Sequence, residues 1–434
     1  MTNFKSKNIA ILGLGLEGKD ALSFLLDKAA KVSVFDRKKE NELDLGRIDR
    51  TKIKLFCGKN YDLSKLFEYD VVVRSPGVYR YQDGIVQAEK NGVDITSPIK
   101  IFLELCPAKT IGVTGTKGKG TTASLIYEIL KASGKDVFFA GNIGVPYLEI
   151  LPKLSEKSIV VLELSSFQLI DAKKSPNVAV VLNITVDHLD WHKDIKEYVE
   201  SKKNIVKYQD NKDFAVINKD YLTSKNFAED TRANVVFFSK KTLQDKYKKR
   251  LLLRGEHNLE NISAAVSTTK IFRTNDTEII AVLSKFKGLE HRLELVGKVK
   301  EVTFYNDSFA TGPQPTIAAI EAFDEPTTLI LGGYDKGLDY SSLARIISKR
   351  KNVKAVLLIG SLSRKIKKEI NKFSFKGKLV ELGKSKMKEI VRKAFEVTPR
   401  GGIVLLSPAA ASFDMFKDYK DRGYQFKEAV KNLK

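Results

Sequence analysis

The segment from Gly115 to Thr122 has the residue types and spacing of a loop that binds a nucleoside triphosphate. Apolar residues lead into it as in a strand, and residues 123–130 continue with helical spacing. Glycines let backbone N–H groups point at phosphate oxygens, and a helix N-terminus adds its positive dipole end. A flexible glycine loop is the alternative interpretation. The predicted phosphate-binding residues are Gly115, Thr116, Lys117, Gly118, Lys119, Gly120, Thr121 and Thr122.

Two positions near this loop fit magnesium chemistry. Gly120 stands directly after Lys119, where Ser or Thr normally follows, so Thr121 is the expected Mg²⁺ hydroxyl, with Thr122 as a substitute. Glu163 ends a very apolar predicted strand, and a carboxylate there is costly to bury unless it meets a cation. Mg²⁺ prefers carboxylate, water and phosphate oxygens. Pairing of Glu163 with a lysine is the alternative.

A second glycine pattern lies near the N-terminus. Residues 13–18 match G-x-G-x-x-G between a predicted strand and helix, and Asp36 closes the next strand. By itself the pattern suggests NAD, but any nucleotide diphosphate satisfies a helix N-terminus, and a structural glycine turn is the alternative. Ser75, Pro76 and Gly77 follow another strand, so they are expected at the same carboxyl edge of the sheet. The pattern itself consists of Gly13, Leu14, Gly15, Leu16, Glu17 and Gly18.

The chain has four histidines, at positions 188, 192, 257 and 291. His188 follows a core strand and is a candidate metal ligand or phosphate contact, although on residue type alone a structural histidine with satisfied hydrogen bonds is favoured. Arg292 precedes the third predicted unit, and its guanidinium could stabilise charge on a transferring γ-phosphate.

The elements that must position these residues alternate between strands and helices, which predicts an α/β fold with parallel sheets. A chain of 434 residues also exceeds what one hydrophobic core normally organises. We therefore expect three α/β units, over residues 1–95, 96–288 and 289–434. The predicted strands are 8–12, 32–35, 71–73, 158–163, 178–183, 302–305, 328–331, 355–359 and 402–406, and the predicted helices include 20–26 and 194–206.

Composition limits the class of protein. No apolar run reaches membrane-spanning length, the N-terminus lacks a signal-peptide core, and Cys57 and Cys106 have no metal-ligand spacing. A cytoplasmic protein without membrane insertion is expected, with the two cysteines as small core residues. The net charge of +22 raises a nucleic-acid hypothesis. Because the basic residues occur throughout the chain and form no basic arm, solvated lysine-rich faces that attract anionic nucleotides are favoured.

In this order, the motifs resemble the Mur ligases of peptidoglycan synthesis, and within that family the branch that adds D-glutamate to UDP-N-acetylmuramoyl-L-alanine. The resemblance runs from about Asn8 to Lys427. The motifs that carry it are the phosphate loop, 141–144 (GNIG), 162–169 (LELSSFQL), 187–190 (DHLD), 255–258 (GEHN), 290–294 (EHRLE), 306–308 (NDS), 331–333 (LGG) and 406–412 (LSPAAAS).

The resemblance implies a Rossmann-like N-terminal domain that holds UDP, a P-loop ATPase-like central domain with a parallel sheet, and a Rossmann-like C-terminal domain. The expected UDP-binding residues are those of the first glycine pattern with Asp36, Arg37, Ser75, Pro76 and Gly77. The expected metal ligands, for two Mg²⁺ sites, are Thr121, Glu163, His188 and Lys202. Lys202 matches a carbamylated lysine of the family, and Lys203 is the competing candidate. Asn142 matches a position near the metals and the substrate carboxylate, Asn261 one near adenine, and Arg292 and Asp307 positions that serve ATP.

The resemblance also implies the reaction. The alanyl carboxylate attacks the γ-phosphate of ATP, and the glutamate amine then displaces phosphate from the acyl phosphate. The catalytic residues implied are Lys119, Asn142, His188, Lys202 and Arg292. Domain closure would protect the acyl phosphate from water. A monomer is expected.

One position departs from this branch. The segment after Asn306-Asp307-Ser308 normally continues with a lysine that grips the amino-acid carboxylate, and here it continues with Phe309. Recognition of the amino acid must then depend on Thr311, Lys336, Ser412, Phe413 and Tyr419. An L-glutamate-adding ligase and a folylpolyglutamate synthase-like ligase are therefore alternatives, although the latter lacks a UDP-binding first domain. A basic protein that binds nucleotides or nucleic acids is the alternative from another class.

Overall fold

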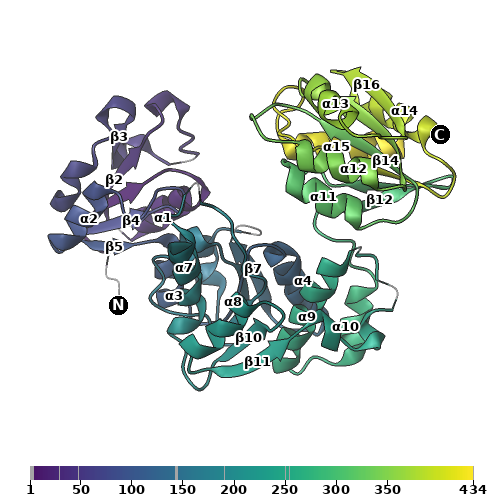
Figure 1. The fold of residues 1–434 in the computed structure, drawn as a ribbon. Coiled ribbons are helices and arrows are strands. Elements are labelled where there is room, and N and C mark those ends of the chain that lie inside the picture. The colour runs from purple at the N-terminus through teal and green to yellow at the C-terminus, as the bar shows by residue number, and fades with distance from the viewer. Residues whose placement is uncertain are drawn as a thin grey trace. The chain divides into compact units, whose positions relative to one another are not determined.

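The computed structural model describes residues 4–28, 30–46, 48–141, 145–189, 191–249, 251–253 and 255–433. The chain divides into two compact units (Figure 1). Unit 1 comprises Met1–Gln244 with Glu260–Val282, and unit 2 comprises Asp245–Leu259 with Leu283–Lys434. Unit 1 contains two sheets and unit 2 contains a third. The expected α/β architecture with parallel sheets is confirmed, whereas the predicted domain boundaries remain predictions.

The first sheet of unit 1 is parallel and has the strand order β3-β2-β1-β4-β5. Its central strand β1 (Asn8–Leu12) is apolar and almost completely buried. The first glycine loop follows this strand directly, so its first residue is fixed by the core of the sheet. The predicted strands correspond to β1, β2 and β4, whereas β3 and β5 were not predicted. The other strands are β2 (Lys31–Asp36), β3 (Ile53–Cys57), β4 (Val71–Arg74) and β5 (Asp94–Thr96).

The second sheet of unit 1 is also parallel, with the order β11-β10-β9-β6-β8-β7. Strand β6 (Lys109–Thr114) lies between β8 (Ile159–Glu163) and β9 (Val178–Val181). The phosphate loop, Glu163 and the segment before His188 thus follow three neighbouring strands whose carboxyl ends meet at one edge. The remaining strands are β7 (Val137–Gly141), β10 (Phe214–Asn218) and β11 (Asn234–Phe238).

The sheet of unit 2 has the order β12-β13-β17-β14-β15-β16. Strand β12 (Glu294–Val299) runs antiparallel to β13 (Val302–Asn306), and the other neighbours are parallel. The carboxyl ends of β13 and of β17 (Ile403–Leu406) lead directly into Asp307 and Ser407. The sequence analysis missed β12 and β16. The remaining strands are β14 (Thr327–Gly332), β15 (Val353–Ile359) and β16 (Lys378–Gly383).

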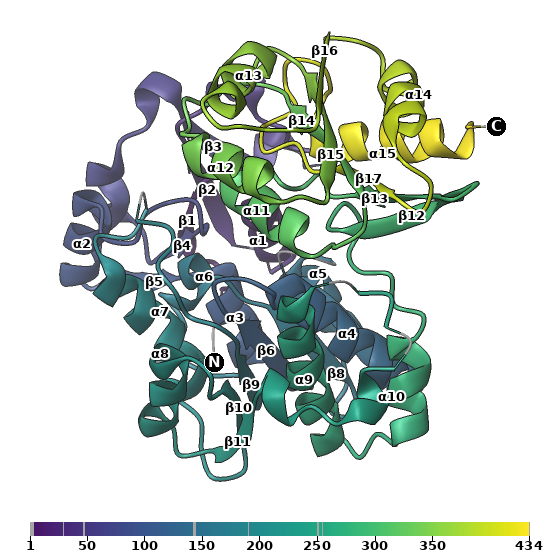
Figure 2. The ribbon, with the colours of Figure 1, turned by 45° about the vertical axis from the view of Figure 1, so that its right-hand side comes forward.

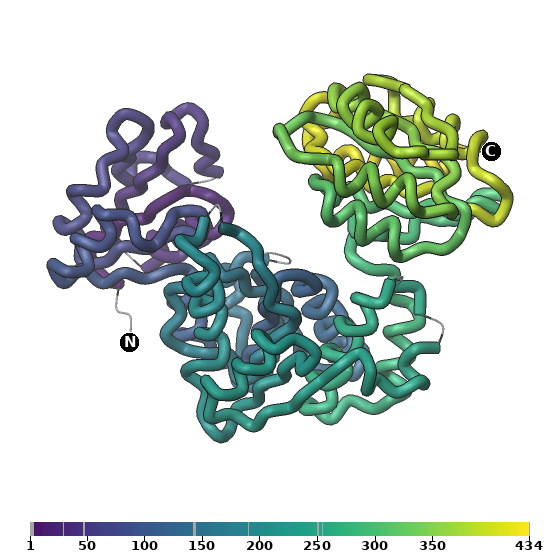
Figure 3. The backbone as a smooth tube through the Cα atoms, in the orientation of Figure 1, coloured from purple at the N-terminus to yellow at the C-terminus, as the bar shows by residue number. Residues whose placement is uncertain are grey.

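Helices cover the sheets, and the backbone can be followed from strand to strand in Figure 3. Among the described residues, no helix has the length and apolar character needed to cross a membrane. The helices of unit 1 are α1 (Leu16–Asp27), α2 (Asp83–Lys90), α3 (Pro98–Leu105), α4 (Lys119–Ala132), α5 (Tyr147–Ile150), α6 (Ser166–Leu169), α7 (Ile195–Lys207), α8 (Leu222–Lys225) and α10 (Asp276–Leu283). Helix α9 (Glu256–Ile271) begins in unit 2 and continues in unit 1, and unit 2 contains α11 (Pro313–Glu321), α12 (Ser341–Lys349), α13 (Ser363–Asn371), α14 (Met387–Val397) and α15 (Tyr419–Lys431).

Candidate nucleotide and substrate sites

The phosphate loop joins β6 to α4 and is packed against α9 of the same unit. Gly118 has φ +84°, and a Cβ atom there would lie 2.2 Å from Oδ1 of Asn261. Thr122 Oγ1 donates to the same oxygen at 3.3 Å, so α4 and α9 lie side by side (Figure 2). Both the backbone conformation and the available space at position 118 therefore require glycine. The contact also places Asn261, the predicted adenine residue, directly at the loop.

Lys119 is folded back over the loop that precedes it. Its Nζ donates to the carbonyl oxygens of Gly115 at 3.0 Å and Thr116 at 3.1 Å. Asn183, after β9, receives the N–H of Thr116 on its carbonyl at 2.7 Å and the N–H of Lys117 on Oδ1 at 3.0 Å. Two N–H groups of the loop therefore bind protein oxygens, while the first-turn N–H groups of α4 have no acceptor within their own helix.

The two candidate Mg²⁺ hydroxyls lie in different environments. Thr122 is completely buried and bound to Asn261, whereas Thr121 is partly exposed on the first turn of α4. Glu163 is 5% exposed at the end of β8, where its Cα pairs with Val113 of β6, two residues before the loop. A hydroxyl and a carboxylate are oxygen donors of the kind Mg²⁺ takes, so Thr121 and Glu163 fit this ion.

Lys202 reaches the phosphate loop from α7. It is 2% exposed, and its Nζ donates to Gly115 O at 3.0 Å and to Thr114 Oγ1 at 3.3 Å. Burial, reinforced by the charge of Lys119, holds the pKa of this amine well below its usual value. Lys203, the competing candidate, forms ion pairs with Glu200 and Asp230 near the surface. Lys202 is therefore the lysine whose amine is buried beside the loop, with a lowered pKa, whereas Lys203 is engaged at the surface.

His188 and His192 differ in how far their rings are exposed and in the contacts of their ring nitrogens. The side chain of His188 is 45% exposed, and its ring packs edge-on against Phe167 at 4.8 Å. His192 is 2% exposed, and its two ring nitrogens contact Glu197 Oε1 at 3.1 Å and Ser166 Oγ at 2.9 Å. Within the described ranges, no group of three or more His, Cys, Asp or Glu side chains could hold a metal ion by itself. A metal at His188 would therefore need further ligands, such as phosphate oxygens or a carbamate.

The first glycine loop is closed by two hydrogen bonds from predicted residues. The N–H of Leu14 donates to Asp36 Oδ2 at 2.7 Å, and Ser75 Oγ donates to Gly13 O at 2.6 Å. A Cβ atom at Gly18 would lie 2.0 Å from Gly13 O, so the loop can only pack this tightly against glycine. The structure thus brings together the glycine pattern, Asp36 and the Ser75 segment, as predicted from their positions at strand ends.

Other predicted UDP-binding residues have distinct surroundings. Leu16 is 64% exposed, and Arg37 lies over the ring of Tyr61 at 5.6 Å. The carboxyl group of Glu17 accepts a hydrogen bond from Gln168 Nε2 at 2.6 Å, and burial raises its pKa to about 7. The Glu17 side chain therefore points to the part of unit 1 that contains the second sheet. Its predicted role in UDP binding remains a prediction, as do those of Gly15, Pro76 and Gly77.

Unit 2 places Arg292, Phe309 and Asp307 close together. The guanidinium of Arg292 lies over the ring of Phe309, 4.0 Å from its centroid, and Tyr419 packs edge-on against the same ring at 5.0 Å. Asp307 accepts hydrogen bonds from Ser407 Oγ at 2.6 Å and from the Leu293 N–H at 3.2 Å, and burial raises its pKa to about 7. Phe309, at the position where the resemblance led us to expect a lysine, thus lies beside an arginine.

The remaining predicted amino-acid-binding residues follow strands of the same sheet. Lys336 is exposed after β14, and Ser412 is buried while Phe413 is 65% exposed after β17. Thr311 is partly exposed after β13. Asn142 lies outside the described residues. These assignments stay predictions.

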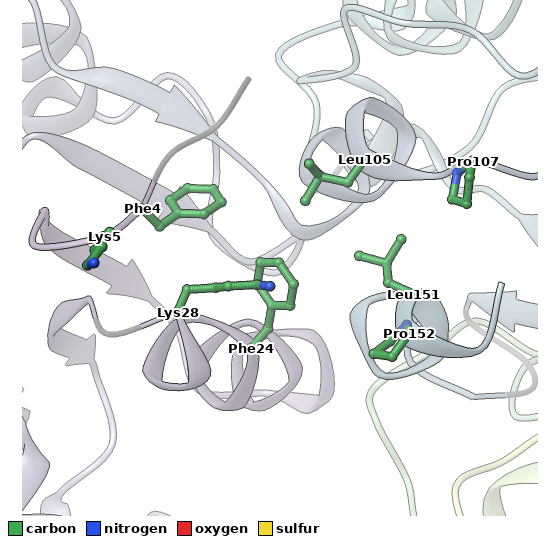
Figure 4. A pocket seen from close by; sticks show the side chains of 8 residues that line it. All are labelled: Phe4, Lys5, Phe24, Lys28, Leu105, Pro107, Leu151 and Pro152. Atoms are coloured by element: carbon green, nitrogen blue, oxygen red, sulfur yellow. The ribbon is translucent and has the colours of Figure 1, made fainter. Parts of the chain in front are cut away.

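One pocket of about 610 Å³ is separate from all of these residues. It is lined mainly by apolar side chains, with Lys28 lying over the ring of Phe24 at 5.5 Å (Figure 4). None of the predicted site residues lines it. The lining residues are Phe4, Lys5, Phe24, Lys28, Leu105, Pro107, Leu151 and Pro152.

Three family models match the chain in succession. The Mur ligase MurD-like N-terminal domain matches residues 7–97, the Mur ligase middle domain residues 113–269, and the Mur ligase glutamate ligase domain residues 291–410. A curated relative, the UDP-N-acetylmuramoylalanine–D-glutamate ligase of Acetivibrio thermocellus, is 38% identical over 99% of this chain and 97% of its own length. The chain belongs to the Mur ligase family.

A second curated relative supports this membership, and one solved structure shares the fold. The ligase of the same name from Clostridium tetani is 38% identical, again over 99% of this Mur ligase and 97% of its own length. The crystal structure of MurF ligase from Thermotoga maritima in complex with ADP shares the fold, with a TM-score of 0.59 and 18% identity over 98% of this chain and 96% of that one. The family resemblance stated from the motifs is confirmed.

Two residues of this Mur ligase were given no role by the sequence analysis. Asn183 binds the phosphate loop through its backbone and side chain, and its position at the end of an apolar strand was the available signal. Arg422 is fully buried on α15 and donates from Nε to Ser308 Oγ at 2.9 Å and from Nη1 to Ala410 O at 3.1 Å. No local pattern distinguishes Arg422 from a solvated helical arginine, because its partners lie far away in the sequence.

Proposed function

We propose that this Mur ligase joins D-glutamate to UDP-N-acetylmuramoyl-L-alanine with cleavage of ATP to ADP and phosphate. The observation that carries the proposal is the 38% identity to a D-glutamate ligase over 99% of the chain. The phosphate loop between β6 and α4 supports the ATP requirement, because its residues have the order, the glycine conformation and the lysine that triphosphate binding needs.

The reaction proceeds in two steps. A carboxylate oxygen of the alanyl group attacks the γ-phosphorus of ATP, the bond to the β-phosphate oxygen breaks, and ADP leaves with its electron pair. The glutamate amine then attacks the acyl carbon, loses a proton, and expels inorganic phosphate from the tetrahedral intermediate. In the first step negative charge accumulates on the transferring phosphoryl group, so fixed positive charges nearby lower the barrier.

Lys119 and Arg292 are proposed to supply such charges. Lys119 Nζ is held by two loop carbonyls, 3.0 and 3.1 Å away, and phosphate oxygens could replace these acceptors. Arg292 is kept over the ring of Phe309, which orients its planar guanidinium. Asp307, whose burial raises its pKa to about 7, is proposed to contribute to nucleotide binding.

Mg²⁺ fits the donors around the phosphate loop, and when bound it would neutralise phosphate charge. Thr121 and Glu163 would hold one ion, and His188 with a carbamate on Lys202 would hold a second. Carbamylation joins the Lys202 nitrogen to the carbon of CO₂ and releases a proton, so a buried amine becomes an anion. The lowered pKa of Lys202 favours this reaction, since only an unprotonated amine has the electron pair to attack CO₂.

The first domain is proposed to bind the UDP moiety through the loop of residues 13–18 and the turn at Ser75. The hydrogen bonds of Asp36 and Ser75 already set the shape of this loop. Arg292 beside Phe309 keeps a cation where the family lysine would have stood, so an acidic amino acid remains a reasonable substrate.

Phosphate release from ATP, UDP-N-acetylmuramoyl-L-alanine and glutamate tests the proposal. Turnover is expected with D-glutamate and at least about 10-fold less with L-glutamate. Lys119→Ala should abolish turnover. Higher turnover with L-glutamate would replace the proposed stereochemistry, and absence of phosphate release with either isomer would overturn the ligase function.

A further inference from the structure

We propose that Arg74 is a positioning residue that connects the turn proposed to bind UDP with the segment that carries His188. This inference rests on the proposed function of those two segments. Arg74 is the last residue of β4 and has no exposed surface, although arginine is among the residues least often buried. Both segments belong to unit 1.

On one side, Arg74 holds the turn that follows it. Its Nη1 donates to the carbonyl oxygens of Ser75 at 3.1 Å and Pro76 at 3.3 Å, and also to Val78. Three carbonyl groups of the turn therefore point inward at one nitrogen. The Ser75 hydroxyl on the same turn closes the first glycine loop through Gly13 O. The shape of the proposed UDP site thus depends on where this guanidinium lies.

On the other side, Arg74 binds the segment around α6 of the second sheet domain. Its Nη2 donates to Phe167 O at 2.6 Å, and its Nε donates to Asp171 Oδ2 at 2.8 Å. Asp171 is itself held by Arg80, whose Nε lies 3.0 Å from Oδ1. A lysine has one side-chain nitrogen and cannot donate both to the turn carbonyls and to Phe167 and Asp171, so the planar guanidinium of arginine is required.

Phe167 extends this connection to the predicted metal ligand. Its ring packs against His188 at 4.8 Å and against Trp191 at 4.5 Å. Tyr79, from the strand-end segment after the turn, packs edge-on against Trp191 at 5.2 Å and donates its hydroxyl to Glu197 Oε2 at 3.0 Å. Glu197 lies on α7, which also carries Lys202.

A contact that only held the two sheet-containing parts of unit 1 together would not need an arginine. Burying a guanidinium and a carboxylate is costly, and well-packed apolar side chains often replace such pairs without loss of stability. The Arg74 guanidinium instead donates to three carbonyls of the turn and to the Phe167 carbonyl, and so fixes the position of the turn relative to Phe167. Losing the guanidinium should consequently loosen the turn that is proposed to bind UDP, and Trp191, which packs on Phe167, should report that change.

Trp191 makes the connection observable, because it is the only tryptophan of the chain. We expect its fluorescence to change saturably when the wild-type protein is titrated with UDP-N-acetylmuramoyl-L-alanine without ATP. In Arg74→Lys, the midpoint of this titration should rise at least 10-fold. The KM for the UDP substrate should rise similarly, while the KM for ATP should change less than about twofold.

Arg80→Lys is the matched control, because Arg80 binds the same Asp171 but donates to none of the turn carbonyls in the described structure. Arg80→Lys should leave the fluorescence midpoint and the KM for the UDP substrate within about twofold of wild type. If Arg74→Lys does not fold, Tyr79→Phe provides the test, since it keeps the ring on Trp191 and removes the bond to Glu197. That variant should raise the UDP-substrate midpoint about threefold.

The inference is overturned if Arg74→Lys and Arg80→Lys behave alike, or if the KM values for both substrates rise together. It is also overturned if Trp191 fluorescence does not respond while wild-type turnover saturates normally with the UDP substrate. Absence of turnover in the wild type would instead reject the proposed function, so the two failures are distinguishable.

Discussion

Lys202 and Lys203 are adjacent on α7 but face opposite environments. Successive residues of a helix are rotated by about 100°, so one amine enters the protein beside Gly115 while the other pairs with Glu200 and Asp230. The pKa of the buried amine lies well below its usual value, chiefly through burial. Position on the helix, and not residue type, distinguishes the reactive candidate.

Lys202→Ala is expected to lower kcat by about 100-fold or more, as when an electrostatic group near the reacting phosphate is lost. If Lys202 acts as a carbamate, formate or acetate should restore part of the activity, because a small carboxylate can occupy the space of the anion. Phosphate release measures both effects. Lys203→Ala is the control and should retain activity within about twofold; equal losses in the two variants, or no rescue, would contradict the carbamate.

Phe309 supports Arg292 through a ring-to-guanidinium contact of 4.0 Å. Removing the ring in Phe309→Ala should cost about 1 kcal/mol of cation–π attraction and allow the arginine to move, so kcat/KM for ATP should fall about fivefold. Phe309→Tyr keeps the aromatic face and should stay near wild type. Unchanged kinetics in the alanine variant would show that Arg292 needs no such support.

At the scale of elements, α1 carries two carboxylates that turn toward the second sheet domain. Asp20 accepts hydrogen bonds from the N–H groups of Leu148 and Glu149 at the start of α5, at 2.8 and 3.1 Å, and burial raises its pKa to about 6. Glu17, one turn earlier, has its pKa raised to about 7, again mainly by burial. The packing of α1 on this neighbour therefore depends on the protonation of both groups.

The sign of the pH dependence follows from the raised pKa of Glu17. Below about pH 4.5 the group is protonated in both folded and unfolded chains, and above about pH 7 the folded chain buries an ionised carboxyl. The contribution of Glu17 to the free energy of unfolding is consequently present at low pH and lost as pH rises through 7. Glu17→Gln cannot ionise, so it should be more stable than wild type at pH 8 by about 1–3 kcal/mol and similar at pH 4.5.

Thermal melting at the two pH values measures this difference. Glu104→Gln changes an exposed carboxylate on α3 and should shift the melting temperature equally at both pH values. A Glu17→Gln variant that is less stable than wild type at pH 8 would contradict the assignment of burial as the dominant effect.

At the scale of the whole molecule, basic residues occur throughout the chain, but the net charge is concentrated in one segment. Residues 341–400 contain 18 Lys and Arg but 4 Asp and Glu, and so carry +14 of the total +22. This segment includes α12, α13, α14, β15 and the edge strand β16 of unit 2. A lysine on an edge strand, such as Lys378 of β16, also discourages pairing with another chain.

The uneven charge predicts weak, salt-dependent attraction to polyanions that is unrelated to catalysis. Replacing Lys354, Lys376, Lys378 and Lys384, all exposed, by Gln should weaken binding to double-stranded DNA about 10-fold at 50 mM salt and flatten its salt dependence. Phosphate release should not change. The same replacement at Lys54, Lys59, Lys65 and Lys90, exposed lysines of unit 1, is the control and should weaken binding less. A parallel loss of turnover and DNA binding in the unit 2 variant would contradict the separation of this attraction from catalysis, whereas DNA binding by a wild type without phosphate release would favour the nucleic-acid alternative.

Much of the fold was predictable because its central strands are continuous apolar runs. The predicted strands 8–12, 178–183 and 355–359 correspond to β1, β9 and β15 within one or two residues at each end. The strands that were not predicted include β3, β12 and β16 at sheet edges, where partly exposed residues break the apolar pattern. They also include β10, which is buried inside the second sheet, so edge position does not explain every omission. The antiparallel pairing of β12 with β13 depends on neighbours in space, which local periodicity does not encode.

The sequence by itself determined the family, the order of the α/β units and the residues that follow each strand, because glycine spacing and apolar periodicity act locally. Only the tertiary structure decided which of those side chains are exposed or buried, and which already have hydrogen-bond partners within the protein. It separated Thr121 from Thr122, Lys202 from Lys203 and His188 from His192, and it placed Arg74 between two loops. The reason is that burial and hydrogen bonding are set by partners distant in the chain, and these control whether a side chain is charged, oriented or already engaged.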